Sequence, residues 1–290
     1  MRENKVVYGL IGYGGMGRWH TEILSNVSEA VIGGIYDIKE EKREEAKEKG
    51  FFVYETEEAM LADPDIDVVL IATPNDCHKP IAIRAMHAGK NVISEKPVTL
   101  SSADLLEMEN AAKETGKLLT VHQNRRWDDD FLIIKKLVEE QKLGHVFRIE
   151  SRVHGSRGIP GDWRKEKVHG GGMVLDWGVH LLDQILYMYG DRKIETVYAS
   201  LTNVTNQEVD DGFTAILTFE GGTEVLVEVG TNNYISLPRW YVLGEDGTAV
   251  IRDWQLNGEI IRKTGRTEET VVPVKTAAGL TKTMAPRRED

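Results

Sequence analysis

Close to its start the chain runs from an apolar stretch directly into a cluster of glycines and then into a segment with helical spacing. Val6–Ile11 has the composition of a buried strand, and the next six residues fit the pattern G-x-G-x-x-G. In this pattern the first glycine permits a tight turn, the second lets a diphosphate approach the backbone, and the third lets the following helix pack against the strand. The positive end of the helix dipole then faces the anion. We therefore expect a dinucleotide cofactor to contact Gly12, Tyr13, Gly14, Gly15, Met16 and Gly17.

Apolar strands and helical segments keep alternating over the first 125 residues. Further strands are expected at 31–36, 67–72 and 91–94, and helices at 15–25, 39–49, 80–89 and 101–116. Parallel strands joined by helices need right-handed crossovers, which produce a sheet that is covered on both faces. The predicted fold class is therefore α/β, beginning with a Rossmann dinucleotide-binding domain.

The pattern changes after Gln123. Phe147, Ile149, Ser151 and Val153 alternate with charged residues, and the same alternation recurs at 213–219 and 223–229. A period of two predicts strands of an antiparallel sheet with one wetter side. We therefore expect a Rossmann NAD(P)-binding domain over residues 1–125 and a second α/β domain over 126–290, built on an open, mostly antiparallel sheet. From Thr276 onward the sequence shows no clear element, and a linker or disordered segment is expected there.

Composition narrows the class of protein further. The formal net charge of −11 disfavours a nucleic-acid partner, because an acidic surface repels phosphates. No apolar run reaches the ~18 residues that a membrane span needs, so no membrane partner is expected. The single cysteine, Cys77, rules out an internal disulfide framework and fits a reducing compartment, so we expect a cytoplasmic protein. Cysteine clusters and an H-E-x-x-H pattern are both absent from the sequence, so no metal is expected.

An acid stands at the end of the second expected strand. Asp37 follows Gly17 by about 20 residues, the spacing at which a carboxylate accepts hydrogen bonds from the adenosine ribose hydroxyls. The same carboxylate would repel a 2′-phosphate, so NAD is expected rather than NADP. Lys39 and Arg43 lie nearby and weaken that preference.

A short loop follows the strand expected at 67–72. Ligands of open α/β sheets bind beyond the carboxyl ends of the strands, so Thr73, Pro74 and Asn75 are expected beside the cofactor. His78 comes at the start of the next helix, where it either contacts the cofactor or only begins the helix.

Farther along, Gly170-Gly171-Gly172 precedes an apolar helix that carries Asp176 and His180. At a spacing of four residues these two side chains lie about one turn apart on one face, and burying both is costly unless they pair or meet a ligand. Imidazole titrates near neutral pH, so His180 is the candidate base for oxidising an alcohol. Asp176 can orient its ring and stabilise its charged form. The alternative is a purely structural hydrogen bond between the two.

Several short motifs stand in register with these features. Glu95-Lys96-Pro97 follows the strand expected at 91–94, Gln123-Asn124-Arg125-Arg126-Trp127 comes next, and Asp162-Trp163-Arg164 precedes the three glycines. Together with the glycine turn they make the chain resemble the Gfo/Idh/MocA family of glucose–fructose oxidoreductase and inositol dehydrogenase-like enzymes, from about Lys5 to at least Val250. The resemblance implies an open-sheet second domain that binds substrate and builds a homodimer or homotetramer. Relatives usually continue past the point where this chain stops, so late strands are expected to be missing.

The resemblance also implies roles for particular residues. By position Lys96, Asp176 and His180 match the family's catalytic set, and Glu95 and Lys96 join the cofactor contacts. Lys96 would donate to the substrate oxygen and stabilise its developing negative charge. The peptide before Pro97 is often cis in relatives. Other segments can also reach the pocket, so the expected substrate contacts are Lys96, Asn124, Arg126, Trp163, Asp176 and His180.

The leading hypothesis is an NAD-dependent oxidoreductase that transfers a hydride between a secondary hydroxyl of a sugar, inositol or related polyol and nicotinamide. Two alternatives stay open at this point. One is an enzyme that cleaves glycosides by transient sugar oxidation and elimination. The other is a non-catalytic sugar-sensing protein, against which the intact Lys96, Asp176 and His180 argue.

Overall fold

A computed structural model describes residues 4–263, 271–276 and 279–284 of the 290-residue chain. The fold forms two compact units. The first contains the chain up to Asn124 together with Arg157–Asp183 and Thr202–Gly212, and the second contains Arg125–Ser156, Gln184–Leu201 and the segment from Phe213 onward. The predicted division into 1–125 and 126–290 stays a prediction, and the compact units differ from it because two later segments group with the first unit.

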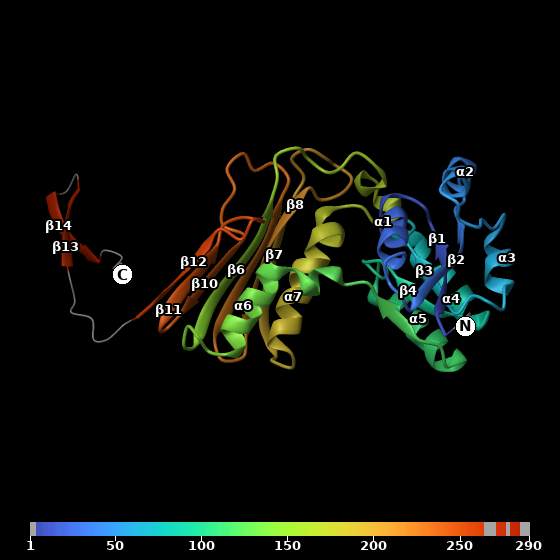
Figure 1. Cartoon of the computed structure of the whole chain (residues 1–290). Coiled ribbons are helices and arrows are strands. Elements are labelled where there is room, and N and C mark those ends of the chain that lie inside the picture. The colour runs from blue at the N-terminus through green and yellow to red at the C-terminus, as the bar shows by residue number, and fades with distance from the viewer. Residues whose placement is uncertain (1–3, 264–270, 277–278, 285–290) are drawn as a thin grey trace. The chain divides into compact units, whose positions relative to one another are not determined.

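The first unit is built on a five-stranded parallel sheet (Figure 1). Its strand order is β2-β1-β3-β4-β5. Each neighbouring pair of strands runs parallel, as the alternating sequence pattern predicts. The strands are β1 (Val6–Ile11), β2 (Ala30–Tyr36), β3 (Val68–Ile71), β4 (Asn91–Ser94) and β5 (Leu119–Val121).

Each face of this sheet carries its own core. Side chains alternate along a strand, so Val69 and Ile71 of β3 belong to one core and Leu70 to the other. The first core takes residues from α3, α4 and α5, and the second from α1 and α2. The helices are α1 (Gly15–Leu24), α2 (Glu40–Glu48), α3 (Glu57–Ala62), α4 (His78–His87) and α5 (Ser102–Thr115). Helices therefore cover both faces of a buried parallel sheet, as in a Rossmann fold.

Local sequence sets the ends of α5. The Ser101 hydroxyl accepts a hydrogen bond of 3.1 Å from the Asp104 amide, which satisfies one of the unpaired N–H groups of the first turn. Gly116 follows the last turn in the left-handed conformation at φ 66°, which a residue without a Cβ adopts easily. The helix expected at 101–116 therefore forms with these two residues as its caps.

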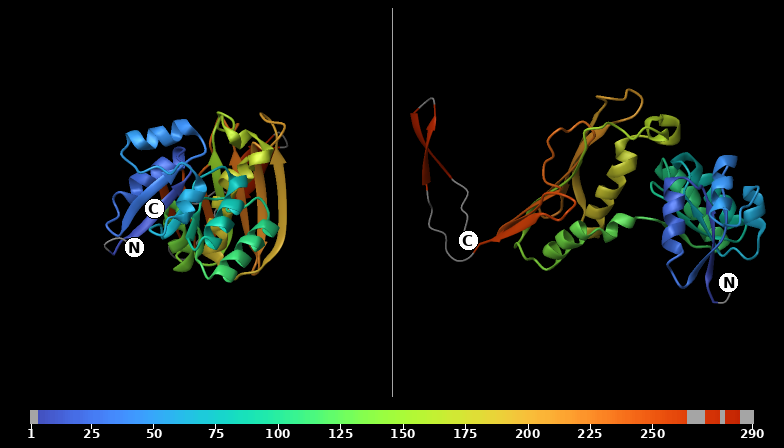
Figure 2. Two further views of the ribbon diagram at one scale, coloured as in Figure 1. Left: turned by 90° about the vertical axis from the view of Figure 1, so that its right-hand side faces the viewer. Right: turned by 45° about the horizontal axis from the view of Figure 1, so that its top comes forward.

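The second unit holds a seven-stranded sheet in the order β12-β11-β10-β6-β9-β8-β7. Strand β10 pairs antiparallel with β6 and with β11, β11 pairs antiparallel with β12, and β6 and β9 run parallel. Helices α6 (Asp129–Glu139) and α7 (Val179–Tyr189) lie along one face (Figures 1 and 2). Tyr189 of α7 stacks on Phe219, and Phe131 of α6 meets Trp240. The strands are β6 (Val146–His154), β7 (Ile194–Thr202), β8 (Gly212–Phe219), β9 (Thr223–Gly230), β10 (Trp240–Gly244), β11 (Gly247–Ile251) and β12 (Gly258–Arg262).

Two expectations for the later strands need correction. Phe147 does not share the buried face with Ile149, because β6 shifts register against β10 at this point and the Phe147 side chain is 44% exposed. The expectation of no element after Thr276 is wrong for Gly279–Met284, which forms β14 and pairs with β13 (Val271–Thr276). The antiparallel pairing of β13 with β14 supplies this order, which the sequence pattern did not reveal. Residues 277–278 and 285–290, to which the same expectation applied, lie outside the described residues.

None of the helices in the described part of the chain is both long enough and apolar enough to cross a membrane.

The close packing of α1 on β1 yields a stability prediction. A Cβ on Gly17 would lie 2.1 Å from the Gly12 carbonyl oxygen, whereas a Cβ on Gly15 would meet no atom within 4 Å. We expect Gly17→Ala to lower the free energy of unfolding by about 1–3 kcal/mol through overpacking. Gly15→Ala, the matched control, should leave stability unchanged or raise it slightly, because alanine favours a helix. Urea denaturation measures both, and equal effects would contradict the close approach.

Candidate active site

The glycine turn after β1 has one tight side and one open side. Gly12 has φ +96°, and a Cβ there would lie 2.6 Å from the Ala72 carbonyl oxygen at the end of β3. Around Gly14 and Gly15 a Cβ would meet nothing within 4 Å, so the backbone is accessible from that side. The first turn of α1 contains no acidic residue and no side-chain cap. The N–H groups of this first turn and the exposed glycine backbone fit a diphosphate, which the positive end of the helix dipole would attract.

Asp37 stands beside this turn at the end of β2. Its Oδ2 accepts a hydrogen bond of 2.7 Å from the Tyr13 amide, and its Oδ1 accepts one of 2.8 Å from the Lys39 amide. The Tyr13 side chain is buried and packs edge-on against Phe51. The Tyr13 amide therefore holds Asp37 and its ring belongs to the core, and the predicted contact of Tyr13 with the cofactor stays a prediction.

The loop after β3 is tied to its surroundings by buried polar side chains. Asn75 lies in a short 3-10 turn (Asn75–Cys77), and its amide nitrogen donates a hydrogen bond of 2.9 Å to the Gly170 carbonyl. The fully buried ring of His78 places Nδ1 2.8 Å from the Pro97 carbonyl and Nε2 3.0 Å from the Thr73 carbonyl. Burial lowers the pKa of His78 despite these carbonyls. His78 thus joins two loops, and its predicted contact with the cofactor stays a prediction.

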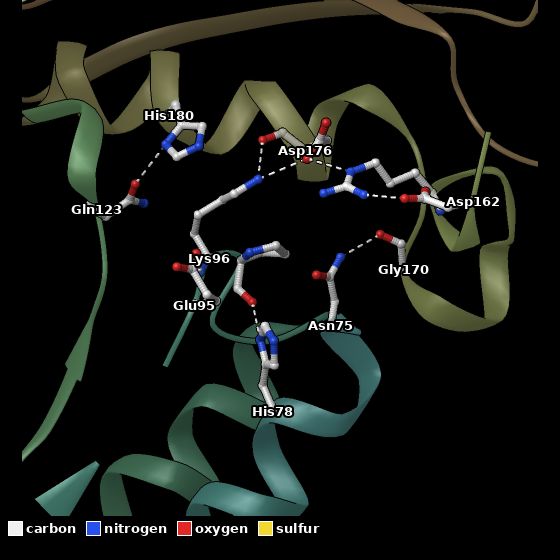
Figure 3. Close-up of polar contacts among 11 residues, drawn as sticks. Asn75, His78, Glu95, Lys96, Gln123, Asp162, Gly170, Asp176 and His180 are labelled. Carbon is white, nitrogen blue, oxygen red and sulfur yellow. Dashed lines mark hydrogen bonds and ion pairs between the residues drawn. The ribbon is translucent and has the colours of Figure 1, made fainter. Parts of the chain in front are cut away.

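Lys96 and Asp176 meet at the centre of the site (Figure 3). The Lys96 ammonium lies 2.9 Å from Asp176 Oδ1 and 2.8 Å from the Asp176 carbonyl oxygen. Arg164 approaches the same Oδ1 at 3.2 Å and pairs with Asp162 at 2.6 Å. Burial raises the pKa of the Asp176 carboxyl, but the Lys96 and Arg164 cations outweigh it and leave the pKa below its usual value. The carboxylate therefore stays ionised and fixes the direction of the Lys96 side chain.

Lys96 reaches Asp176 from a turn with an unusual backbone. Lys96 is the second residue after β4, and the peptide bond between Lys96 and Pro97 is cis.

His180 lies one turn beyond Asp176, near the start of α7. A π-helical turn, Val174–Gly178, carries Asp176 and leads into α7. The buried imidazole places Nδ1 3.2 Å from Gln123 Oε1, and the Trp177 ring meets it edge-on. Gln123 thus helps to orient the imidazole, a task that the sequence analysis gave to Asp176. That predicted role of Asp176 stays a prediction, since the carboxylate bonds shown here go to cations.

Glu95, the neighbour of Lys96, faces a different set of partners. Its Oε1 lies 2.6 Å from His20 Nε2 and 3.0 Å from His122 Nδ1, and its Oε2 accepts from the Lys96 amide at 3.2 Å. Burial raises the pKa of Glu95, but the hydrogen bonds from His122 and His20 outweigh it and lower the pKa to about 2. The carboxylate is therefore buried between two imidazoles, and the expected contact of Glu95 with the cofactor stays a prediction.

The remaining predicted residues fall in both units. Asn124, Trp163, Thr73 and Pro74 belong to the first unit, and their predicted contacts with substrate or cofactor stay predictions. Arg126 belongs to the second unit, where its guanidinium lies over the Tyr187 ring at 4.6 Å. Two residues of the site, Gln123 and Arg164, were not predicted to contribute. The only sign in the sequence that these two residues contribute to the site was their place inside motifs that were already noted.

A lysine, an aspartate and a histidine thus gather in the same compact unit as an open glycine turn. The open glycine turn on a parallel sheet covered on both faces defines a Rossmann-type dinucleotide-binding protein. A model of an oxidoreductase family with an NAD-binding Rossmann fold matches residues 6–123, and the GFO/IDH/MocA C-terminal domain matches residues 131–250. The chain belongs to the GFO/IDH/MocA oxidoreductase family.

Known relatives bear out this membership. The scyllo-inositol 2-dehydrogenase (NADP(+)) IolW of Bacillus subtilis is 31% identical over 244 residues, covering 83% of this chain and 67% of the relative. The myo-inositol 2-dehydrogenase of Thermotoga maritima is 31% identical over 223 residues, covering 74% and 65%. The crystal structure of an NAD-binding protein from Listeria innocua matches with a TM-score of 0.94 and 53% identity, over 99% of this chain and 82% of that one.

The chain spans 45–67% of the length of the first curated relatives that it matches.

The buried carboxylate of Asp176 yields a pH prediction. Its pKa lies below the usual 3.8, so its ionisation stabilises the fold above about pH 4, and this contribution is lost as the pH falls through the lowered pKa. At pH 7 we expect Asp176→Asn to cost about 1–3 kcal/mol, because Lys96 and Arg164 lose a charged partner.

Urea denaturation at pH 7 and at pH 3 measures the difference between Asp176→Asn and the wild type, which should shrink at the lower pH. Asp191→Asn, at an exposed position, is the matched control and should show little difference at either pH. A constant difference across this range would contradict an ion pair at Asp176.

Proposed function

We propose that this protein is an NAD-dependent dehydrogenase that oxidises a secondary hydroxyl of a polyol such as an inositol or a sugar. The bonds between Lys96 Nζ and Asp176, which fix an ammonium in the unit that carries the glycine turn, are the observation that carries the proposal. The inositol dehydrogenases among the relatives support the substrate class.

The dinucleotide would be held by the open glycine turn and the first turn of α1. When bound, NAD supplies the nicotinamide that accepts the hydride from the substrate carbon. The protein has to position the hydroxyl, take its proton and stabilise the charge that develops on its oxygen.

In this proposal the Lys96 ammonium donates a hydrogen bond to the substrate oxygen, which stabilises negative charge as the proton leaves. The Asp176 carboxylate pairs with the same ammonium and holds it in place, and this carboxylate also pairs with Arg164. His180 accepts the hydroxyl proton during oxidation and returns it in the reverse direction. Because Gln123 and Trp177 fix the imidazole before substrate binds, little reorganisation is needed at the moment of transfer.

Replacing the proposed base tests this assignment. We expect His180→Ala to lower kcat by about 10²–10⁴-fold, the usual contribution of a general base, with little change in NAD affinity. The assay is nicotinamide absorbance with a panel of inositols, hexoses and sugar acids, and NAD affinity is followed by quenching of protein fluorescence.

His145→Ala, at an exposed histidine of the second unit, is the matched control and should behave like the wild type. Equal losses of turnover and NAD affinity in His180→Ala would argue against a base. Absence of reduction with every polyol and either cofactor would count against a dehydrogenase.

We further propose that NAD is preferred over NADP. The carboxylate of Asp37 is held by two amides at the end of β2, and it would repel a 2′-phosphate. Arg43 is engaged with the Asp37 and Ile38 carbonyls, which supports the same preference because the guanidinium is already in use. The name of the relative IolW includes NADP(+), so the cofactor preference of this chain has to be measured.

Removing the carboxylate should relax the preference. We expect Asp37→Ser to reduce the ratio of kcat/KM for NAD to kcat/KM for NADP by at least about tenfold, a change of about 1.4 kcal/mol. Asp65→Asn, another acid of the first unit, is the control and should leave the ratio unchanged. A wild-type preference for NADP would overturn the proposal directly.

A further inference from the structure

Three side chains that can bind a metal converge at a second place in the first unit, and none of them belongs to the ion pair of Lys96 with Asp176. His20 comes from α1, Glu95 follows β4, and His122 follows β5. One donor atom from each lies within 4.8 Å of the other two. Since β4 and β5 are neighbouring parallel strands, their carboxyl ends bring Glu95 and His122 to the same edge of the sheet. Residues that are 75 and 27 positions apart in the chain are thus joined at one point.

Ring packing fixes the two imidazoles. The His20 and His122 rings meet edge-on with centroids 4.7 Å apart, and Trp19 contacts both rings, at 5.1 and 5.6 Å. The side chains of His20 and Glu95 are only 6% exposed, whereas that of His122 is 27% exposed. The cluster is therefore ordered by its surroundings and can be reached from solvent on the His122 side.

The chemistry of the donors suits a divalent transition metal. Imidazole nitrogens and a carboxylate oxygen form the His₂Glu set that binds Zn²⁺ with a fourth position left for water. The ligands must be deprotonated to bind, and the pKa of Glu95 is already about 2. The second oxygen of Glu95 accepts from the Lys96 amide, an outer contact of the kind that orients metal ligands.

We propose that His20, Glu95 and His122 bind one Zn²⁺ ion per chain. The ion would link α1, the end of β4 and the end of β5 through three bonds, and it would fix the residue directly before Lys96. Hydride transfer as proposed above does not use this ion. It departs from the sequence expectation of no metal, which considered only clusters recognisable from spacing along the chain.

Zinc titration of the metal-stripped full-length chain tests the proposal, with affinity measured by competition against a chromogenic chelator. We expect one Zn²⁺ per chain for the wild type. His122→Gln keeps a hydrogen-bond donor for Glu95 but removes a good zinc ligand, so affinity should fall by more than the 10–100-fold that loss of an outer-shell partner causes. His87→Gln, at an exposed histidine at the end of α4, is the matched control and should bind like the wild type.

Failure of the wild type to bind Zn²⁺ would overturn the proposal, and so would equal affinity and stoichiometry in the wild type and His122→Gln. Co²⁺ provides a readout that needs no variant. A four-coordinate N₂O site with water gives strong visible absorption, which supports the assignment. The weak absorption of six-coordinate Co²⁺ would overturn it.

Discussion

The ion pair between Lys96 and Asp176 joins parts of the chain that are 80 residues apart, and the arrangement of the site depends on it. Neither charge could be buried alone, because removing an ion from water costs several kcal/mol unless a partner compensates. The turn that follows β4 supplies the cation, and the π-helical turn before α7 supplies both a carboxylate and a carbonyl. The glycine turn and these charged residues therefore belong to one compact unit.

Around this pair the buried charges are arranged as linked sets. Arg164 pairs with both Asp162 and Asp176, and Asp176 in turn pairs with both Arg164 and Lys96. Glu95 is compensated by imidazoles while its neighbour Lys96 is compensated by a carboxylate. Glu95 and Lys96, which are adjacent and of opposite charge, thus have different partners. The Lys96 ammonium therefore faces Asp176 rather than its neighbour.

Features encoded by neighbouring residues could be predicted from the sequence. The glycine turn, the caps Ser101 and Gly116, and the alternation along β8 and β9 each depend on a few consecutive residues. The family resemblance likewise predicted the cis peptide before Pro97.

Partners that are distant in the chain could not be predicted in this way. The Gln123 contact with His180 spans 57 residues, and the His20 contact with Glu95 spans 75. Spacing carries no signal for such pairs, because the fold alone brings them together. For the same reason the sequence did not reveal that the polar atoms of His78 face carbonyls and those of Glu95 face imidazoles.

Two polar interactions join the segment before the π-helical turn to the loop after β3. Asn75 donates to the Gly170 carbonyl, and His169 pairs with Asp76 at 3.0 Å. The side chains of His169 and Asp76 have to be kept together, whereas a residue of any type at position 170 supplies the carbonyl. A chimera that joined residues 1–124 of one homologue to the remainder of another would take the partners of both interactions from different proteins. It would also divide the first compact unit, which contains Arg157–Asp183 as well as the chain up to Asn124. New substrate preferences are therefore expected to arise by changes that keep these two interactions rather than by exchange of whole halves.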